Sequence, residues 1–121
     1  MITIYHNPRC SKSRAALALT EQFAAARQLP LNVVDYQKTP LTLAQLHTLQ
    51  QQLGQPVRAM VRDGEDDYAA LQLEQADDAT LLQAVATHPK LLQRPIVVYH
   101  QRAQIGRPPE ALHQLLRQEL D

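Results

Sequence analysis

The sequence predicts an α/β protein whose chain runs strand–helix–strand, continues through a helical middle section and closes with two strands and a helix. Short runs rich in β-branched and apolar residues, typical of strands, occur at residues 2–5, 31–36 and 96–99. Between and after them, apolar residues recur at spacings of three and four, which is typical of helices. The length of 121 residues favours one domain. We expect a βαβ unit at about residues 1–36, a helical insertion at about 40–90 and a ββα unit at about 95–120.

The opening βαβ unit is marked by its prolines and by one helical stretch. The first strand, residues 2–5, stops at Asn7-Pro8, a pair typical of loops. A helix is predicted over residues 11–28, where alanines favour helix and apolar side chains have helical spacing. These side chains are Ala16, Leu19, Phe23 and Ala26. Pro30 then separates this helix from the strand predicted at residues 31–36.

The middle section is predicted to be wholly helical as far as His88. Thr42 and Gln45 have the spacing of a capping box, which predicts the start of a helix. The apolar side of that helix consists of Leu43, Leu46, Leu49 and Leu53. Shorter helical pieces are expected at residues 57–61 and 68–73, followed by a helix that begins near Asp77 and stops before Pro89.

The closing unit contains the strongest strand pattern in the chain, residues 96–99. Residues 103–105 are the expected hairpin partner, although the connection at residues 100–102 lacks the glycine typical of tight hairpin turns. Pro108-Pro109 fits the start of a final helix. Its buried side is expected to consist of Leu112, Leu115, Leu116 and Leu120.

The composition argues against several functional classes. Twelve Lys and Arg residues balance twelve Asp and Glu residues, which argues against a general nucleic-acid or membrane-surface binder. The single cysteine, Cys10, excludes an intramolecular disulfide, a CxxC redox pair and a cysteine-rich zinc site. The sequence shows neither a signal peptide nor an apolar run long enough to span a membrane. We therefore expect a cytoplasmic protein whose thiol stays reduced.

Cys10 is the first candidate for chemistry, because it lies between a predicted loop and the start of a predicted helix. A thiol at a helix N-terminus faces unpaired backbone N–H groups and the positive end of the helix dipole, which both favour the thiolate. His6, Arg9, Lys12 and Arg14 add cationic neighbours. The pattern indicates a reactive thiol, and the alternative is a buried cysteine that packs as a small apolar side chain.

Activation of this thiol alone would accelerate its reactions little. Lowering a thiol pKa from about 8.5 to about 6.5 raises the thiolate fraction at pH 7 but lowers its nucleophilicity, so that the net gain is about threefold. Orientation of the electrophile must supply more. Arg62, Arg94 and Arg107 are candidates, since a guanidinium binds a tetrahedral oxyanion through two parallel hydrogen bonds. The alternative for each is a solvated surface charge.

Other catalytic patterns are absent from the sequence. The five histidines are too scattered to predict paired metal ligands, so no metal is expected. The three glycines do not form a phosphate-binding loop. The GxSxG motif of serine hydrolases is also missing.

The segment YHNPRCSKSR, residues 5–14, resembles the active-site loop of the glutaredoxin-coupled arsenate reductase family. Further segments agree with this family in order and spacing. They are VRAMVR at residues 57–62, HP at 88–89, QRPIVV at 93–98 and GRP at 106–108. The resemblance extends from residue 2 to about residue 118. It implies a single thioredoxin/glutaredoxin-like domain over residues 1–121, with a βαβ…ββα core and a helical insertion.

The resemblance also assigns roles to individual residues. Cys10 would be the nucleophile, and the oxyanion would be bound by Arg62, Arg94 and Arg107. His6 and Ser13 fall at family positions near the thiolate. Pro95 falls at the cis-proline position of thioredoxin-like folds. No bound cofactor or metal is implied.

The implied reaction needs partners outside the chain. Cys10 would attack arsenate, or a similar oxyanion, to form a thiol–arsenic adduct. Glutathione, as co-substrate, would reduce the adduct, and glutaredoxin would resolve the resulting mixed disulfide. This agrees with the cysteine count, because a protein with one cysteine requires an external thiol to complete each turnover.

Two features leave alternatives open. The loop differs from the resistance-operon enzymes at Arg9, Ser11 and Lys12, so the physiological substrate is not fixed by the resemblance. Relatives of this fold also act as non-enzymatic, redox-responsive adaptors that bind RNA polymerase. Many of those carry a CxxC switch, whereas this chain has Cys10 and Ser13. The sequence therefore favours a reductase, and the adaptor is the alternative.

Overall fold

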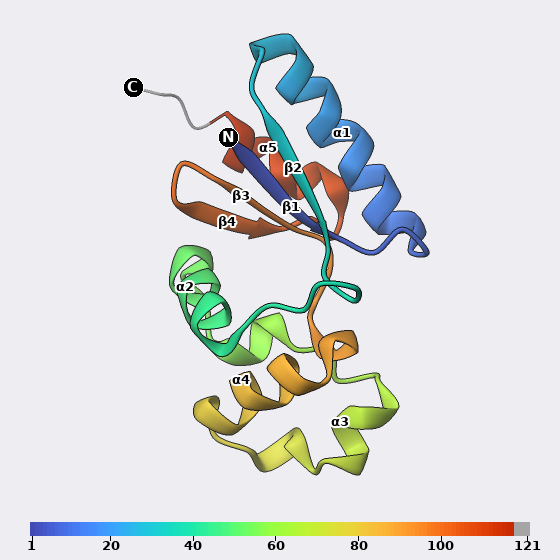
Figure 1. Ribbon diagram of the computed structural model, residues 1–121, viewed down its shortest axis with the longest axis vertical. Helices are drawn as coiled ribbons and strands as arrows, with labels where there is room; N and C mark the ends of the chain where they lie inside the picture. The colour runs from blue at the N-terminus through green and yellow to red at the C-terminus, as the bar shows by residue number, and fades with distance from the viewer. Residues whose placement is uncertain (118–121) are drawn as a thin grey trace. The chain divides into compact units, whose positions relative to one another are not determined.

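The computed structural model describes residues 1–117, which form two compact units (Figure 1). The first unit comprises Met1–Tyr36 together with the residues from Arg94 onward, and the second comprises Gln37–Gln93. These boundaries lie close to the predicted ends of the helical insertion. That the two units make up a single domain stays a prediction.

The first unit contains a four-stranded sheet. Its strands are β1 (Ile2–His6), β2 (Leu31–Asp35), β3 (Ile96–Tyr99) and β4 (Arg102–Ile105). The strand order is β2-β1-β3-β4. β1 and β2 are parallel and are connected by α1 (Ser11–Arg27), which completes the predicted βαβ unit. β3 is antiparallel to both of its neighbours.

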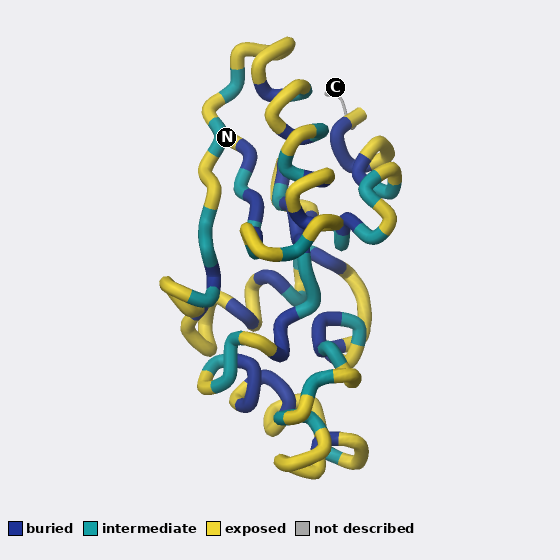
Figure 2. Tube along the Cα trace, turned by 90° about the vertical axis from the view of Figure 1, so that its right-hand side faces the viewer, coloured by how far each residue is buried: buried dark blue, intermediate teal, exposed yellow. Residues whose placement is uncertain are grey.

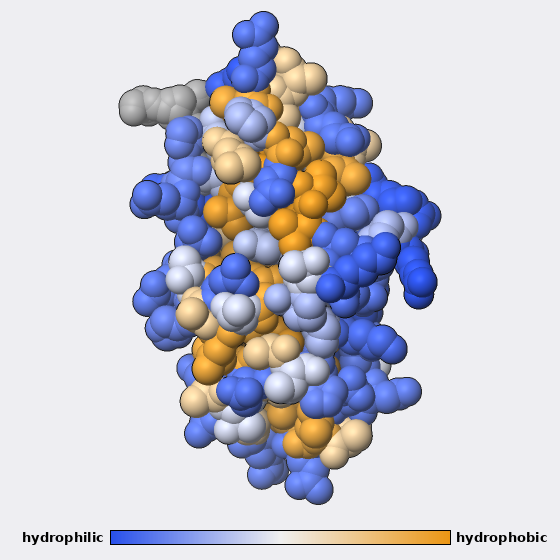
Figure 3. Space-filling view, in the orientation of Figure 1, coloured by the Kyte–Doolittle hydropathy of each residue, from blue (hydrophilic) through white to orange (hydrophobic). Residues whose placement is uncertain are grey.

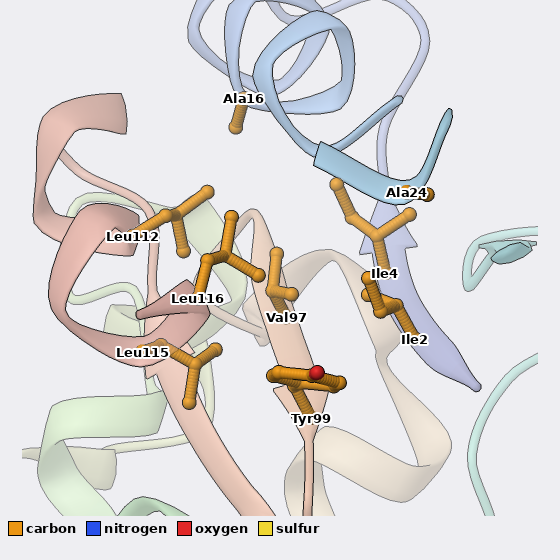
Figure 4. Close-up of a cluster of buried hydrophobic side chains, with 9 residues drawn as sticks. All are labelled: Ile2, Ile4, Ala16, Ala24, Val97, Tyr99, Leu112, Leu115 and Leu116. Atoms are coloured by element: carbon orange, nitrogen blue, oxygen red, sulfur yellow. The ribbon is translucent and has the colours of Figure 1, made fainter. Parts of the chain in front are cut away.

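One face of the sheet packs against α1 and α5 (Leu112–Leu116) (Figure 4). Burial alternates along β1 (Figure 2), as a strand with one side on a core requires. Ile4 of β1 pairs with Val97 of β3, and both side chains are fully buried on this face. The other buried members of the cluster are Ile2, Ala16, Ala24, Tyr99, Leu112, Leu115 and Leu116. This core holds α1 against the sheet and so fixes where its N-terminus lies.

The β3–β4 hairpin is confirmed, although its usual sequence signal is missing. The two strands are joined at His100 and Gln101, whose φ angles are 52° and 63°. Tight hairpin turns need this left-handed conformation, and glycine or asparagine usually supplies it. Two other residues adopt it here, which explains why the turn is hard to recognise from the sequence.

The proline-rich segment after β4 is helical but irregular. A 3₁₀ turn, η4 (Pro109–Ala111), precedes α5, and Leu120 of the predicted apolar side lies outside the described residues. The Arg94–Pro95 peptide bond is cis, as the resemblance implies. The Arg107–Pro108 bond is also cis, which the sequence analysis did not predict.

The second unit is helical, and α2 (Leu43–Leu53) begins at the predicted capping box. The Thr42 hydroxyl accepts a hydrogen bond from the Gln45 N–H at 3.1 Å, and the Gln45 side chain accepts one from the Thr42 N–H at 2.9 Å. The remaining helical elements follow in chain order. They are η1 (Val57–Met60), α3 (Asp66–Ala70), η2 (Leu73–Gln75), α4 (Asp78–Thr87) and η3 (Pro89–Leu91).

The prediction of a wholly helical middle section is wrong at two points. Val61 is extended and forms an isolated antiparallel bridge with Leu92, so η1 ends at Met60. The helix predicted at residues 68–73 is divided between α3 and η2. Between them, Gln72 has a left-handed φ of 55°, which a right-handed helix cannot accommodate.

Most of the surface in view is hydrophilic, with apolar side chains exposed in patches (Figure 3). Within residues 1–117, the large apolar side chains that are exposed belong to Met1, Val33, Leu43 and Leu71. Among the described residues, no helix combines the length and apolar character needed to cross a membrane.

Arg58 connects η1 to the segment between α3 and α4. Its Nη1 donates hydrogen bonds to the Tyr68 hydroxyl at 2.9 Å and to the Leu73 carbonyl at 3.2 Å. Its Nη2 donates to the Ala76 carbonyl at 2.7 Å. One charged side chain therefore holds three points of the second unit together.

Replacing Arg58 by glutamine should lower the free energy of unfolding by about 1–3 kcal/mol, because hydrogen bonds from a charged donor are lost. Urea denaturation of the full chain measures the change. Lys38, an exposed residue of the same unit, provides the control. Lys38→Gln should alter the free energy by less than about 0.5 kcal/mol. Equal losses in the two variants would contradict the structural role of Arg58.

Candidate active site

The predicted site residues of the first unit belong to segments at one edge of its sheet. β1 ends at this edge with His6, and β3 begins there because the two strands are antiparallel, with Tyr5 opposite Ile96. The residues that flank these strand ends and the end of β4 are Cys10, Arg94, Pro95 and Arg107. The sheet topology thus brings together segments that are far apart in the sequence.

A hydrogen bond between Gly106 and Pro95 closes this end of the β3–β4 hairpin. The Gly106 N–H donates to the Pro95 carbonyl at 2.9 Å. A Cβ at Gly106 would lie 3.2 Å from side-chain atoms of both Pro95 and Leu112, so a larger residue would require these side chains to shift by a few tenths of an ångström. Arg94 directly precedes Pro95, and Arg107 directly follows Gly106. Arg94 and Arg107 are therefore the sequence neighbours of two residues, Pro95 and Gly106, that are hydrogen-bonded to each other.

The loop between β1 and α1 is held by its own hydrogen bonds. The Asn7 side-chain oxygen accepts from the Arg9 N–H, and the Asn7 carbonyl accepts from the Cys10 N–H, both at 3.0 Å. Arg14 donates from Nη1 to the Pro8 carbonyl at 3.0 Å. Cys10 is the N-cap residue of α1, as predicted, and its thiol is half-buried. The turn and the helix start therefore position the sulfur.

Opposing effects act on the Cys10 thiol. Burial alone raises its pKa, but the Ser13 N–H, the positive charge of Arg94, the Lys12 N–H and a hydrogen bond from Arg94 all lower it. The net result is a pKa below the usual value for a thiol. Stabilisation of the thiolate therefore comes from both the helix N-terminus and one guanidinium.

Ser13 and His6 form a buried pair beside this loop. The Ser13 side chain is fully buried, and its oxygen lies 2.8 Å from His6 Nδ1 and accepts from the Asn7 N–H at 2.9 Å. Burial lowers the pKa of His6, and the nearby Asp35 carboxylate opposes this shift only in part. The native state therefore binds this proton less readily than the unfolded state does. The contribution of His6 to stability is lost as the pH falls below about 6.5.

The cations around Cys10 have partly different roles from those predicted from the sequence. Arg94 contributes to the environment of the thiol, whereas it was singled out only as an oxyanion ligand. Lys12 acts through its backbone N–H, and the Arg14 guanidinium binds the Pro8 carbonyl. Asn7 was not proposed as a structural residue of the loop. The Asn-Pro pair was its signal, because asparagine side chains favour turns of this kind.

Arg62 belongs to the second unit, where it forms an ion pair. Its Nη1 donates to Glu65 Oε2 at 2.7 Å, and each side chain is 26% exposed. Its backbone N–H donates to the Leu91 carbonyl at 2.8 Å. The predicted place of Arg62 among the oxyanion ligands stays a prediction. As for metals, residues 1–117 contain no group of three or more His, Cys, Asp or Glu side chains that could hold an ion.

Comparisons with known proteins identify close relatives. The model of the ArsC family matches residues 5–115. A Neisseria meningitidis arsenate reductase is 44% identical over 118 residues, which cover 95% of this chain and 97% of that protein. An Escherichia coli K12 arsenate reductase is 33% identical over 117 residues, 95% of this chain and 80% of that protein. The solved structure of an arsenate reductase from Vibrio cholerae has a TM-score of 0.83 at 46% identity and covers 93% of this chain and 95% of that chain. The predicted thioredoxin-like α/β fold is confirmed.

The environment of Cys10 predicts a thiol that titrates below about 8.5, the value of an unperturbed cysteine. The pH dependence of its alkylation by iodoacetamide measures this midpoint. Arg94→Gln should raise the midpoint, because the substitution removes a positive charge and a hydrogen bond. Arg102→Gln, an exposed substitution in the same unit, should leave it unchanged. A midpoint at or above 8.5 in the unaltered chain would contradict the prediction.

Ser13→Ala separates the structural role of the serine hydroxyl from the role of its backbone. The free energy of unfolding should fall by about 1–3 kcal/mol, because Asn7 and His6 each lose a buried partner. The Ser13 N–H remains, so the alkylation midpoint should move less than it does in Arg94→Gln. Urea denaturation and alkylation measure the two effects, with the exposed Ser11→Ala as control. A large shift in the midpoint without any loss of stability would reverse this assignment.

Proposed function

The chain belongs to the ArsC family, and we propose that it is an arsenate reductase in which Cys10 is the nucleophile. The observation that carries this proposal is the environment of the Cys10 sulfur. It is half-buried at the start of α1, next to the Ser13 N–H and the charge of Arg94. Such a thiol is both nucleophilic and accessible to an anion. Relatives named arsenate reductase that align with 95% of this chain support the choice of substrate.

In the first step the Cys10 thiolate attacks the arsenic atom of arsenate. An As–S bond forms, and one arsenate oxygen leaves as water after protonation. Two like charges 4 Å apart repel by about 4 kcal/mol at an effective dielectric constant of about 20. Arg94, Arg107 and Arg62 offset this repulsion by binding the arsenate oxygens. The contact between Arg94 and Cys10 supports this role for Arg94, and the resemblance supports it for the other two.

The second step transfers two electrons to arsenic. The thiolate of glutathione attacks the Cys10 sulfur, the As–S bond breaks with its electron pair on arsenic, and arsenite leaves. Cys10 then carries glutathione as a mixed disulfide. A glutaredoxin thiolate removes the glutathionyl group and restores the Cys10 thiolate. The chain itself needs no bound cofactor in this scheme, because glutathione supplies the electrons, and the reducing cytoplasm is the compartment that suits it.

The reaction is tested by following NADPH consumption with arsenate, glutathione, glutaredoxin and glutathione reductase. Cys10→Ser should abolish turnover. Lysine in place of Arg62, Arg94 or Arg107 should lower kcat/KM by roughly 10–150-fold, since loss of the two-bond guanidinium contact costs about 1.5–3 kcal/mol. Arg102→Lys is the matched control, and its rate should equal that of the unaltered protein.

Two results would overturn parts of the proposal. Absence of arsenate turnover with the full thiol system would exclude the reductase and favour a non-enzymatic adaptor. Unchanged rates in the three lysine variants would exclude these arginines as oxyanion ligands. A parallel assay in which thioredoxin and its reductase replace the glutathione components identifies the thiol system, because only the correct one sustains turnover.

A further inference from the structure

The Arg62 guanidinium is already engaged by a carboxylate of its own unit. Arg62 Nη1 donates to Glu65 Oε2 at 2.7 Å, a distance typical of a charge-assisted hydrogen bond. Both side chains are only 26% exposed, so water screens the pair less than it screens a surface ion pair. Any other anion that uses this guanidinium must therefore share it with Glu65 or displace Glu65.

Local backbone contacts hold both partners in place. The Arg62 N–H donates to the Leu91 carbonyl at 2.8 Å, directly after the bridge between Val61 and Leu92. Glu65 is the N-cap residue of α3, and its carbonyl accepts from the Tyr68 N–H at 3.0 Å. The Glu65 carboxylate makes no capping hydrogen bond to α3. The carboxylate pairs with Arg62 instead, so the start of the helix does not depend on it.

A carboxylate and a tetrahedral oxyanion bind the same N–H donors of a guanidinium. Each presents negatively charged oxygen atoms that accept the parallel N–H groups of arginine. The segment that follows Arg62 adds to the competition, because Asp63, Asp66 and Asp67 accompany Glu65. Their field also disfavours an incoming anion, but of these four carboxylates only that of Glu65 is hydrogen-bonded to the Arg62 guanidinium.

We propose that Glu65 sets the affinity of the oxyanion site, because its carboxylate competes with the incoming oxyanion for Arg62. The inference rests on the proposed function, in which Arg62 is an oxyanion ligand. Glu65, which was not a candidate from the sequence, would thereby weaken oxyanion binding at Arg62. Removal of this carboxylate strengthens oxyanion binding, whereas removal of a true ligand weakens it.

The competing explanation is structural. A pair at positions i and i+3 can stabilise the turn between η1 and α3 without any part in binding. In that case its removal would lower the free energy of unfolding and leave anion affinity unchanged. The two explanations therefore differ in the sign and kind of effect that one substitution produces.

The test compares Glu65→Gln with Asp66→Asn in the full chain. Both substitutions remove one negative charge from the same segment, but Asp66 is exposed and not paired with Arg62. Affinity is measured as protection of Cys10 from iodoacetamide by inorganic phosphate and by arsenate without glutathione, and the KM for arsenate is measured in parallel. Glu65→Gln should bind both anions about three- to tenfold more tightly than Asp66→Asn does, the effect expected of a half-buried competing contact. The gain should shrink in an Arg62→Lys background, because the two residues then no longer form the same contact.

Each other outcome overturns a distinct part of the argument. Equal gains in Glu65→Gln and Asp66→Asn would mean that the general field of the segment acts, not competition at Arg62. Unchanged or weaker binding in Glu65→Gln, with lower stability in urea, would establish the structural explanation. Absence of protection by either anion in all variants would exclude the oxyanion site and this inference with it. If the expected ratio is found but arsenate is not turned over, the competition holds and only the reductase is excluded.

Discussion

The arrangement around Cys10 depends on the burial of Ser13. Its side-chain oxygen joins the end of β1 at His6 to the loop at Asn7, and its N–H faces the Cys10 sulfur. A fully buried hydroxyl must be satisfied within the protein, so strand, loop and helix are held in one relative position. The apolar core under α1 makes this possible, because it keeps the helix on the sheet.

The thiol environment is a balance between two requirements. Partial burial keeps water away from the sulfur but raises the pKa of Cys10. The Ser13 and Lys12 N–H groups and the Arg94 guanidinium reverse this shift, since each favours the negative charge. Arg94 is well suited to a second task, because a group that stabilises the thiolate can also attract the anion that the thiolate attacks. In the proposed reaction, the guanidinium that stabilises the thiolate would also reduce the repulsion between the thiolate and the oxyanion.

Within the second unit, Arg62 is held by its own neighbours. Arg62 is fixed at its backbone by Leu91 and at its side chain by Glu65. An arginine paired in this way is pre-oriented, so in the proposed oxyanion site it would lose less side-chain entropy on binding. In the same proposal the pairing would weaken that binding, because the Glu65 carboxylate competes for the guanidinium. For the proposed oxyanion binding, the pre-orientation of Arg62 and the competition from Glu65 therefore have opposite effects on affinity.

Most helices and strands, and the position of the candidate thiol, can be predicted from local sequence patterns. β-branched runs located β1, β2 and β3, the Thr42–Gln45 spacing located the start of α2, and the junction before Ser11 placed Cys10 at a helix N-terminus. These are local properties, set by side chains within a few residues of one another. The single cysteine likewise predicts that the proposed reductase would need an external thiol to complete each turnover.

Contacts between residues that are distant in the sequence depend on how the strands are ordered and paired. The contact of Arg94 with Cys10 joins residues 84 positions apart, and the meeting of Pro95 with Gly106 depends on the register of β3 and β4. No spacing in the sequence encodes such contacts, because they arise from strand order and register. The hairpin turn at His100 and Gln101 and the left-handed Gln72 likewise lack a local signal. Their backbone conformations are imposed by the surrounding fold, which outweighs the weak preferences of the residues themselves.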